Sequence, residues 1–161
     1  MDLISFLQNT GAGRVLITFL ISMTPIFELR GAIPVGVSMG LSHWGALMIS
    51  IIGNMVPVPL IILFIRKIFS WLRVKIPSLE NFINKLEQKA ESKKGLIEKW
   101  KFFGLYILVA IPLPGTGAWT GALVAALLDI RLKRAIPAIL LGVLTAGILV
   151  TGITFGFTEI F

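Results

Sequence analysis

Four apolar stretches, separated by polar connections, dominate the pattern of hydrophobic and polar positions along the chain. Two of them, residues 45–65 and 135–158, contain no charged residue. A helix rises 1.5 Å per residue and the hydrocarbon core of a bilayer is about 30 Å thick, so about 20 apolar residues suffice for one crossing. We therefore predict a full transmembrane helix in each of these two stretches.

The other two apolar stretches are each interrupted near the middle by residues that a regular spanning helix avoids. The first, about residues 14–42, is broken by two prolines and two charged residues: Pro25, Glu28, Arg30 and Pro34. The second, about residues 102–128, is broken by prolines and glycines: Pro112, Pro114, Gly115 and Gly117. Each arm is too short to cross alone. Each stretch is therefore either one kinked span or a re-entrant hairpin that returns to the side it entered.

Basic residues are concentrated in the polar segment 67–101 and in a basic cluster after the second broken stretch, formed by Arg131, Lys133 and Arg134. Lys and Arg mark the cytoplasmic side of membrane proteins, so we predict that 67–101 is a cytoplasmic linker. A full crossing by 102–128 would leave the basic cluster outside, whereas a hairpin keeps it cytoplasmic. The charges therefore favour hairpins, with both termini on the outer side.

The linker carries apolar residues at helical spacing: Leu79, Phe82, Ile83, Leu86 and Ala90. Ser78, after Pro77, is a candidate N-cap, and Gly95 is a candidate stop. We predict an amphipathic helix, whose basic face either lies on anionic lipid or packs on the protein's own cytoplasmic side.

Both halves of the chain follow the same order of broken stretch, short polar connection and full span. Aligning Pro25 with Pro112 brings Gly53 within two positions of Gly142. Because the linker is cytoplasmic, the first half enters the membrane from outside and the second from inside, which makes the repeats inverted. Inverted repeats with broken helices are typical of transporters.

The predicted fold is a single all-α integral membrane domain over residues 1–161. Its first repeat (1–66) and second repeat (102–161) each consist of a re-entrant hairpin and a full transmembrane helix. Breaks in lipid persist only where protein or a wet cavity surrounds them, so we expect the two hairpins to meet at a mid-membrane site.

Composition narrows the class of protein further. Of 161 residues, 56% are hydrophobic and 14% are charged, whereas a soluble domain carries about 25% charge. This balance excludes a disordered chain and a soluble enzyme. The net charge of +7 would suggest nucleic acid in a soluble protein, but clustered at membrane boundaries it indicates topology, so no nucleic-acid partner is expected.

Few residues of the chain are suited to catalysis or to metal binding. There is no cysteine, and His43 is the one histidine of the sequence. The sequence contains no Walker loop, no Ser-His-Asp set and no cofactor fingerprint. We expect neither an enzyme nor a bound metal or cofactor.

Glu28 and Arg30 are the first candidate site residues, because an ionised side chain at the bilayer centre costs about 2.5–3.5 kcal/mol. In the functional interpretation, Glu28 binds and releases a proton, while Arg30 holds an anionic group or the Glu28 carboxylate. In the structural interpretation, the pair only satisfies the broken backbone. Residues two apart on a regular helix do not face each other, so direct pairing requires non-helical geometry.

The second broken segment supplies backbone amides, the hydroxyls of Thr116 and Thr120, and the indole of Trp119. A helix that begins near Thr116 would direct its positive end at a bound anion. Alternatively, threonine caps this helix, and Gly115 and Gly117 only allow close packing.

Asn54 lies in the first full span, just before Pro57 and Pro59. It either lines the cavity or bonds to the carbonyls that these prolines free. The basic cluster either contacts lipid headgroups or only determines topology.

The segments TPIFELRGAIPVG (24–36) and IPLPGTGAWTGAL (111–123) resemble the two signature segments of the putative small multi-drug export protein family. The resemblance extends over essentially the whole chain and implies transport. That family is similar in proposed architecture to the DedA superfamily, regarded as inverted-repeat membrane proteins with re-entrant loops and ion-coupled transport or lipid-carrier flipping. Glu28 and Arg30 match charged residues of the first DedA hairpin, but the second hairpin here has no charge before Asp129.

We therefore predict a small, multi-pass transporter of the inner membrane that is coupled to protons. Its substrate would be a drug-like compound or a lipid-linked phosphate. The rival interpretation is a non-transporting scaffold or a lipid scramblase. A homodimer through small residues such as Gly142, Ala146 and Gly147 is a further prediction.

Overall fold

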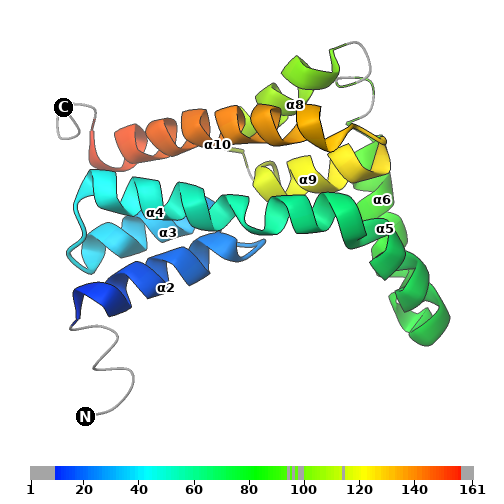
Figure 1. Ribbon diagram of the computed structural model, residues 1–161, viewed down its shortest axis with the longest axis horizontal. Helices are drawn as coiled ribbons and strands as arrows, with labels where there is room; N and C mark the ends of the chain where they lie inside the picture. Colours follow the sequence, from blue (N-terminus) through cyan, green and yellow to red (C-terminus); the bar gives the residue numbers. More distant parts are fainter. Residues whose placement is uncertain (1–9, 94, 96, 98–99, 114, 157–161) are drawn as a thin grey trace. The chain divides into compact units, whose positions relative to one another are not determined.

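The computed structural model describes residues 10–93, 95, 97, 100–113 and 115–156, and every regular element among them is helical (Figure 1). The elements are α2 (Gly11–Met23), α3 (Glu28–Ser38), α4 (His43–Met55), α5 (Pro57–Lys75), the short 3₁₀ helix η1 (Pro77–Leu79), α6 (Glu80–Glu91), α8 (Lys101–Ala110), α9 (Ala118–Leu127) and α10 (Leu132–Phe155). The predicted all-α class is confirmed.

Two of these helical stretches are long and apolar enough to cross a membrane, residues 43–75 and 132–155. They contain or largely overlap the predicted spans 45–65 and 135–158. The first helical stretch continues beyond the predicted span to Lys75. The reason is that Arg and Lys are good helix formers, and no glycine or proline interrupts the chain before Pro77. The basic residues mark a polar boundary without ending the helix.

The first long helical stretch is interrupted at Val56, between α4 and α5. Pro57 and Pro59 follow immediately, and proline has no backbone N–H for the regular helical bond. The N–H of Val56 donates instead to the carbonyl of Gly53, at 3.3 Å. The break therefore falls directly after Asn54 and Met55, inside an apolar stretch.

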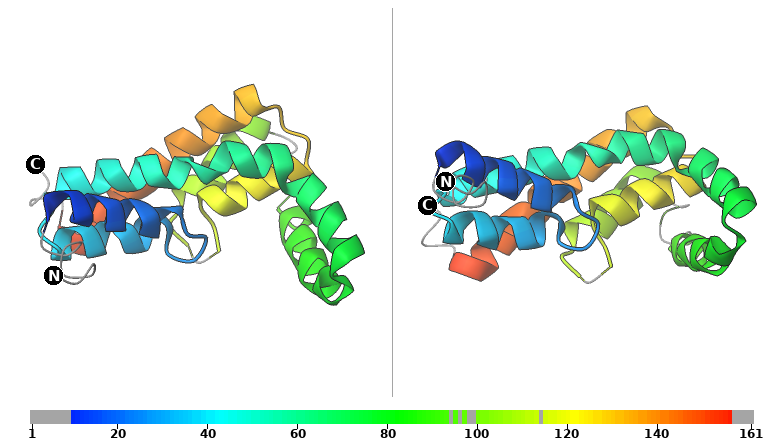
Figure 2. Two further views of the ribbon diagram at one scale, coloured as in Figure 1. Left: turned by 60° about the horizontal axis from the view of Figure 1, so that its bottom comes forward. Right: turned by 90° about the horizontal axis from the view of Figure 1, so that it is seen from below.

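The chain forms two compact units, which we describe separately. The first unit contains residues 1–57 and 143–161, and the second contains residues 58–142. In the first unit, α2 and α3 pack against each other and both pack against α4, as Figure 2 also shows. The turn between α2 and α3 is closed by Thr24, whose hydroxyl donates to the carbonyl of Ile21 at 2.7 Å. The arms of the first broken stretch are thus an antiparallel helical pair.

In the second unit, α8 and α9 pack against each other, and α6 of the linker packs against α9. The predicted amphipathic helix is present, but Ser78 is not its N-cap, because Pro77–Leu79 first forms η1 and Leu79 occupies the cap position. Ile83 and Ala90 are buried, so this helix uses its apolar face against the protein itself. A contact of its basic face with lipid stays a prediction.

A glycine of each long apolar helix meets the first helix of the preceding hairpin. A Cβ atom added at Gly53 of α4 would lie 2.7 Å from the carbonyl oxygen of Phe19 in α2. A Cβ atom added at Gly142 of α10 would lie 3.0 Å from the carbonyl oxygen of Tyr106 in α8. A real Cβ atom does not approach another atom as closely as 2.7 Å, and the added Cβ at Gly142 would also lie 2.6 Å from the Cβ of Val109. In both units, a glycine without a side chain therefore allows two helices to pack closely.

These two contacts also share one register. The side chain that flanks the contact is Ser22 in the first unit and Val109 in the second. Ser22 and Val109 are separated by the same number of residues as Pro25 and Pro112, the positions that align the two halves of the sequence. This one glycine contact is thus equivalent in the two units.

The small residues that suggested a dimer contact are used within the chain. Gly142 lies against Val109, Gly147 lies against Leu47, and Ala146 is 2% exposed. Within one chain these three positions are already covered, and a dimer that uses them stays a prediction. Dimerisation through another face stays a prediction.

Replacing Gly53 with alanine should destabilise the first unit, because the new methyl group would clash with Phe19 and Ser22. We expect a loss of about 1–3 kcal/mol, the usual cost of overpacking, measured as a lower midpoint of thermal unfolding in detergent. Gly11→Ala is the matched control, since nothing lies within 4 Å of its added Cβ. Equal stability of the two variants would show that α2 and α4 are not in this close contact.

Candidate functional site

The first broken segment places a buried carboxylate at a strained backbone position. Glu28 begins α3, its side chain is 5% exposed, and its φ of +47° lies in the left-handed region. A residue with a Cβ atom adopts this region at a cost of about 1–2 kcal/mol. The Glu28 N–H donates to the carbonyl of Thr24 at 3.1 Å, which closes the turn. Strain of this kind at a buried ionisable group is typical of functional sites.

Arg30 lies in the first turn of α3, half-buried, and is attracted electrostatically by the Glu28 carboxylate. The left-handed conformation at Glu28 is the non-helical geometry that the interaction was predicted to require. Pro34, half-buried within α3, removes the regular donor to the Arg30 carbonyl, while Pro25 is exposed in the turn. The two residues are near enough for the Glu28 carboxylate to act electrostatically on Arg30, and both interpretations of the pair stay predictions.

The second broken segment is a turn held by its own hydroxyl groups. Thr116 Oγ lies 2.7 Å from the carbonyl of Ile111 and 2.8 Å from that of Leu113. Thr120 donates to the carbonyl of Gly115 at 3.1 Å. Gly115 has a φ of +78° and Gly117 a φ of +137°, conformations that favour glycine.

The N-terminus of α9 differs from the sequence expectation in two details. The helix begins at Ala118 rather than near Thr116, and its N-cap is Gly117, which offers no side-chain bond. The hydroxyls of Thr116 and Thr120 donate to the carbonyls of the turn, and capping of α9 by threonine stays a prediction. The remaining candidates of this segment are Pro112 and Trp119, both half-buried, and Pro114, which lies outside the described residues.

Lys89 of the linker helix reaches this turn, a contact that the sequence analysis missed. A Cβ atom added at Gly115 would lie 2.7 Å from the Lys89 ammonium nitrogen. Lys89 directly precedes the buried Ala90, so the helical period of α6 could have placed it beside the buried face. The turn is thus accompanied by one positive charge from the linker.

Asn54 is fully buried near the C-terminal end of α4, and its amide atoms have no hydrogen-bond partner among the described residues. It does not bond to the carbonyls freed by the prolines, so that interpretation is wrong. Ser50, one helical turn earlier on the same face, is also fully buried and lacks a partner among the described residues. Ser50 lies four residues before Asn54, and residues at this spacing share one face of a helix. The sequence could therefore have identified Ser50 as a neighbour of Asn54.

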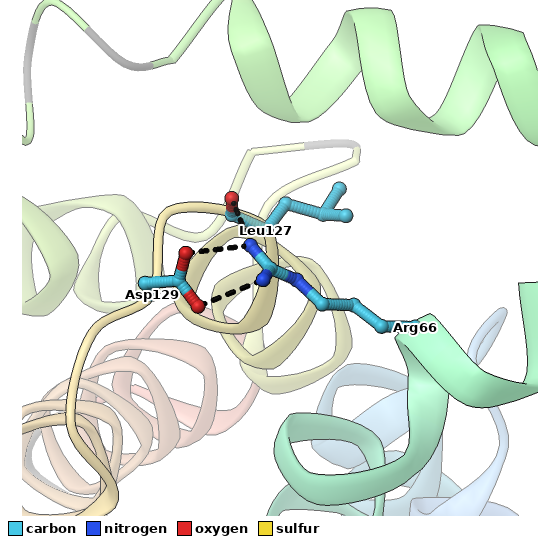
Figure 3. Close-up of polar contacts among 3 residues, drawn as sticks. All are labelled: Arg66, Leu127 and Asp129. Carbon is cyan, nitrogen blue, oxygen red and sulfur yellow. Dashed lines mark hydrogen bonds and ion pairs between the residues drawn. The ribbon is translucent and has the colours of Figure 1, made fainter.

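An ion pair joins α5 to the C-terminal end of α9 (Figure 3). Arg66 of α5 contacts both carboxylate oxygens of Asp129, at 2.8 and 3.0 Å, and donates to the carbonyl of Leu127 at 2.8 Å. Asp129 has a φ of +53° and lies where α9 ends, in the position usually held by glycine or asparagine. Arg66 therefore both pairs with the carboxylate and caps the negative end of α9.

The basic cluster of Arg131, Lys133 and Arg134 follows this ion pair and is exposed. Asp129 points to Arg66 and not to its basic neighbours in sequence. A cavity of about 300 Å³ lies beside the ion pair and includes both acidic and basic residues in its lining, among them Glu91, Lys101 and Asp129. Contact of the cluster with lipid headgroups stays a prediction.

The predicted site residues fall into separate groups. Glu28, Arg30 and Asn54 belong to the first unit, whereas residues 112–120 and the basic cluster belong to the second. The meeting of both broken segments at one mid-membrane site therefore stays a prediction. Within the described part of the chain, no group of three or more His, Cys, Asp or Glu residues could hold a metal ion.

Two apolar helices are long enough to span a membrane, and charged and polar groups lie at breaks of the apolar helices, which suggests a helical membrane protein. The chain belongs to the family described as putative small multi-drug export protein, which matches residues 28–149, about three quarters of its length. No curated protein and no solved structure matched the chain. The family assignment made from the two signature segments is confirmed, and the family description names export rather than catalysis.

Breaking the Arg66–Asp129 ion pair should lower stability only modestly, because the two side chains are 48% and 80% exposed. We expect Arg66→Gln and Asp129→Asn to be non-additive in a double-mutant cycle, with a coupling of at most about 1 kcal/mol that shrinks at high salt. Chemical unfolding in detergent measures this coupling, and Arg131→Gln is the control, since Arg131 has no ion pair with another described residue. Fully additive losses would contradict the ion pair.

Proposed function

We propose that the protein is a small transporter of the inner membrane that moves an amphipathic substrate and is coupled to protons. The observation that carries this proposal is Glu28, a buried carboxylate at a strained break between two apolar helices, beside Arg30. Membership of an export family supports a transport role. Buried ionisable residues within membrane segments commonly mark ion or substrate pathways.

The proposed membrane arrangement consists of two re-entrant hairpins, α2–α3 and α8–α9, and two full spans, α4–α5 and α10. The linker and the basic cluster face the cytoplasm, and both termini face the outer side. The equivalent contacts of Gly53 and Gly142 support an internal repeat, because each long helix meets its hairpin in the same register. The positions of the basic residues support the orientation.

Proton coupling follows from the charge balance of the Glu28–Arg30 pair. When Glu28 is ionised, its carboxylate compensates the Arg30 guanidinium. When Glu28 takes up a proton, the positive charge of Arg30 is released to attract an anionic group of the substrate. Proton binding and binding of an anionic group then favour each other, as linkage requires of two coupled ligands.

The proposed substrate is amphipathic, either a drug-like compound or a lipid-linked phosphate. Lys89 and the backbone turn at Gly115 support an anionic headgroup, because they bring a positive charge beside the second broken segment. In the proposal both broken segments contribute to one mid-membrane site. A lipid scramblase or a non-transporting scaffold is the alternative, and it requires neither a gradient nor a titrating carboxylate.

The substitution Glu28→Gln should abolish proton-coupled transport, because a neutral amide cannot release a proton to control Arg30. The assay uses proteoliposomes with an imposed pH gradient and two fluorescent probes, a lipophilic cation and an anionic phospholipid. We expect at least a tenfold loss of gradient-driven movement, with the amount of protein in the membrane unchanged.

Glu80→Gln, an exposed position of the linker helix, is the matched control and should transport normally. Transport that is unchanged by Glu28→Gln and constant across pH would contradict the proposal. Lipid movement without any gradient in both variants would assign the scramblase role instead.

A further inference from the structure

The first unit encloses five small polar residues with no exposed surface: Thr18, Ser22, Ser50, Asn54 and Thr151. Three of them donate their hydroxyl to a carbonyl of their own helix, which satisfies the donor. The acceptors are the carbonyls of Arg14, Phe19 and Gly147, at 2.7–2.8 Å. Ser50 Oγ and both amide atoms of Asn54 make no such bond within the described residues.

The position of Ser50 and Asn54 on α4 directs them into the interior of the first unit. On one side of this face, Gly53 lies against α2; on the other, Leu47 packs against Gly147 of α10. At 100° per residue, Ser50 and Asn54 point between these two contacts. Their polar atoms therefore lie among packed helices rather than toward surrounding lipid.

Burial of polar atoms without partners costs free energy, and hydrocarbon surroundings offer no water to offset it. A ligand that contacts both Ser50 and Asn54 would recover this cost. Because both residues are 0% exposed, the ligand must be of atomic dimensions. A drug-like molecule or a lipid headgroup is too large for this position.

The end of the helix determines the charge that this position favours. Ser50 and Asn54 occupy the last two turns of α4, before Val56, whose helical backbone leads directly into α5. Pro59 has no N–H, so the carbonyl of Met55 lacks its regular helical donor. A carbonyl oxygen without a donor repels an anion and attracts a cation, and carbonyls at breaks of membrane helices coordinate Na⁺ in transporters.

We propose that Ser50 Oγ and Asn54 Oδ1 are ligands of a monovalent cation, Na⁺, bound inside the first unit at the end of α4. Both ligands are neutral oxygens, the type that hard cations accept. A divalent ion is disfavoured because its larger desolvation cost calls for carboxylate ligands. This site does not depend on the proposed transport activity, since binding is measured without transport.

The test compares thermal unfolding of the purified full chain in NaCl and in choline chloride at equal ionic strength. Bound Na⁺ stabilises the folded state by mass action, so we expect the unfolding midpoint to rise by about 5 °C once Na⁺ exceeds its Kd about 100-fold. The variants Ser50→Ala and Asn54→Leu should lose this rise. Neither variant breaks a hydrogen bond to another described residue, so both are expected to fold.

Thr151→Val is the matched control, because Thr151 is equally buried in the same unit but its hydroxyl is already bonded to Gly147. It should keep the full Na⁺ effect. Equilibrium binding of radioactive ²²Na⁺ to the wild-type protein tests the site without any variant. Absence of both stabilisation and ²²Na⁺ binding would overturn the proposal and leave the pair as a water-binding position. A rise that persists in Ser50→Ala and Asn54→Leu would overturn the assignment to these residues.

Discussion

Backbone hydrogen bonding is the constraint on which the rest of this structure depends. In hydrocarbon, no water satisfies an N–H or C=O group that a helix break releases, so each break must be closed by the chain itself. Thr24 closes the turn between α2 and α3, and Thr116 and Thr120 close the turn between α8 and α9. The threonines of the signature segments are thereby explained as parts of the turns, and a direct substrate contact is not needed to account for them.

The need to satisfy backbone hydrogen bonds also explains where the ionisable and buried polar side chains lie. Breaks allow non-helical geometry, and the break before α3 lets Glu28 adopt a left-handed conformation beside Arg30. The break after α4 leaves Ser50 and Asn54 at a helix end within a packed unit. The buried carboxylate and the two buried polar residues without partners among the described residues therefore all lie at breaks of apolar helices, where ion and substrate sites of membrane transporters are commonly found.

The helical class, the two long apolar helices and the two broken stretches could be predicted from sequence, because apolar length and helix-breaking residues are local properties. Contacts between distant segments could not. The pairing of Arg66 with Asp129 and the approach of Lys89 to Gly115 each join residues that are remote in sequence, and no local pattern encodes them. Ser78 was mistaken for a cap because a 3₁₀ helix precedes α6, a detail that depends on a single turn of backbone.

We propose that α8 and α9 form a hairpin that enters and leaves the membrane on the cytoplasmic side. The sequence contains no cysteine, so the single substitution Lys133→Cys can be tested in intact cells with a membrane-impermeant maleimide. Ser38→Cys, expected outside, and Lys85→Cys, expected inside, are matched controls at exposed positions. If the hairpin is present, the maleimide should not label Lys133→Cys in intact cells, but should label it after the cells are opened. Labelling from outside would make residues 102–128 a full span and contradict the hairpin.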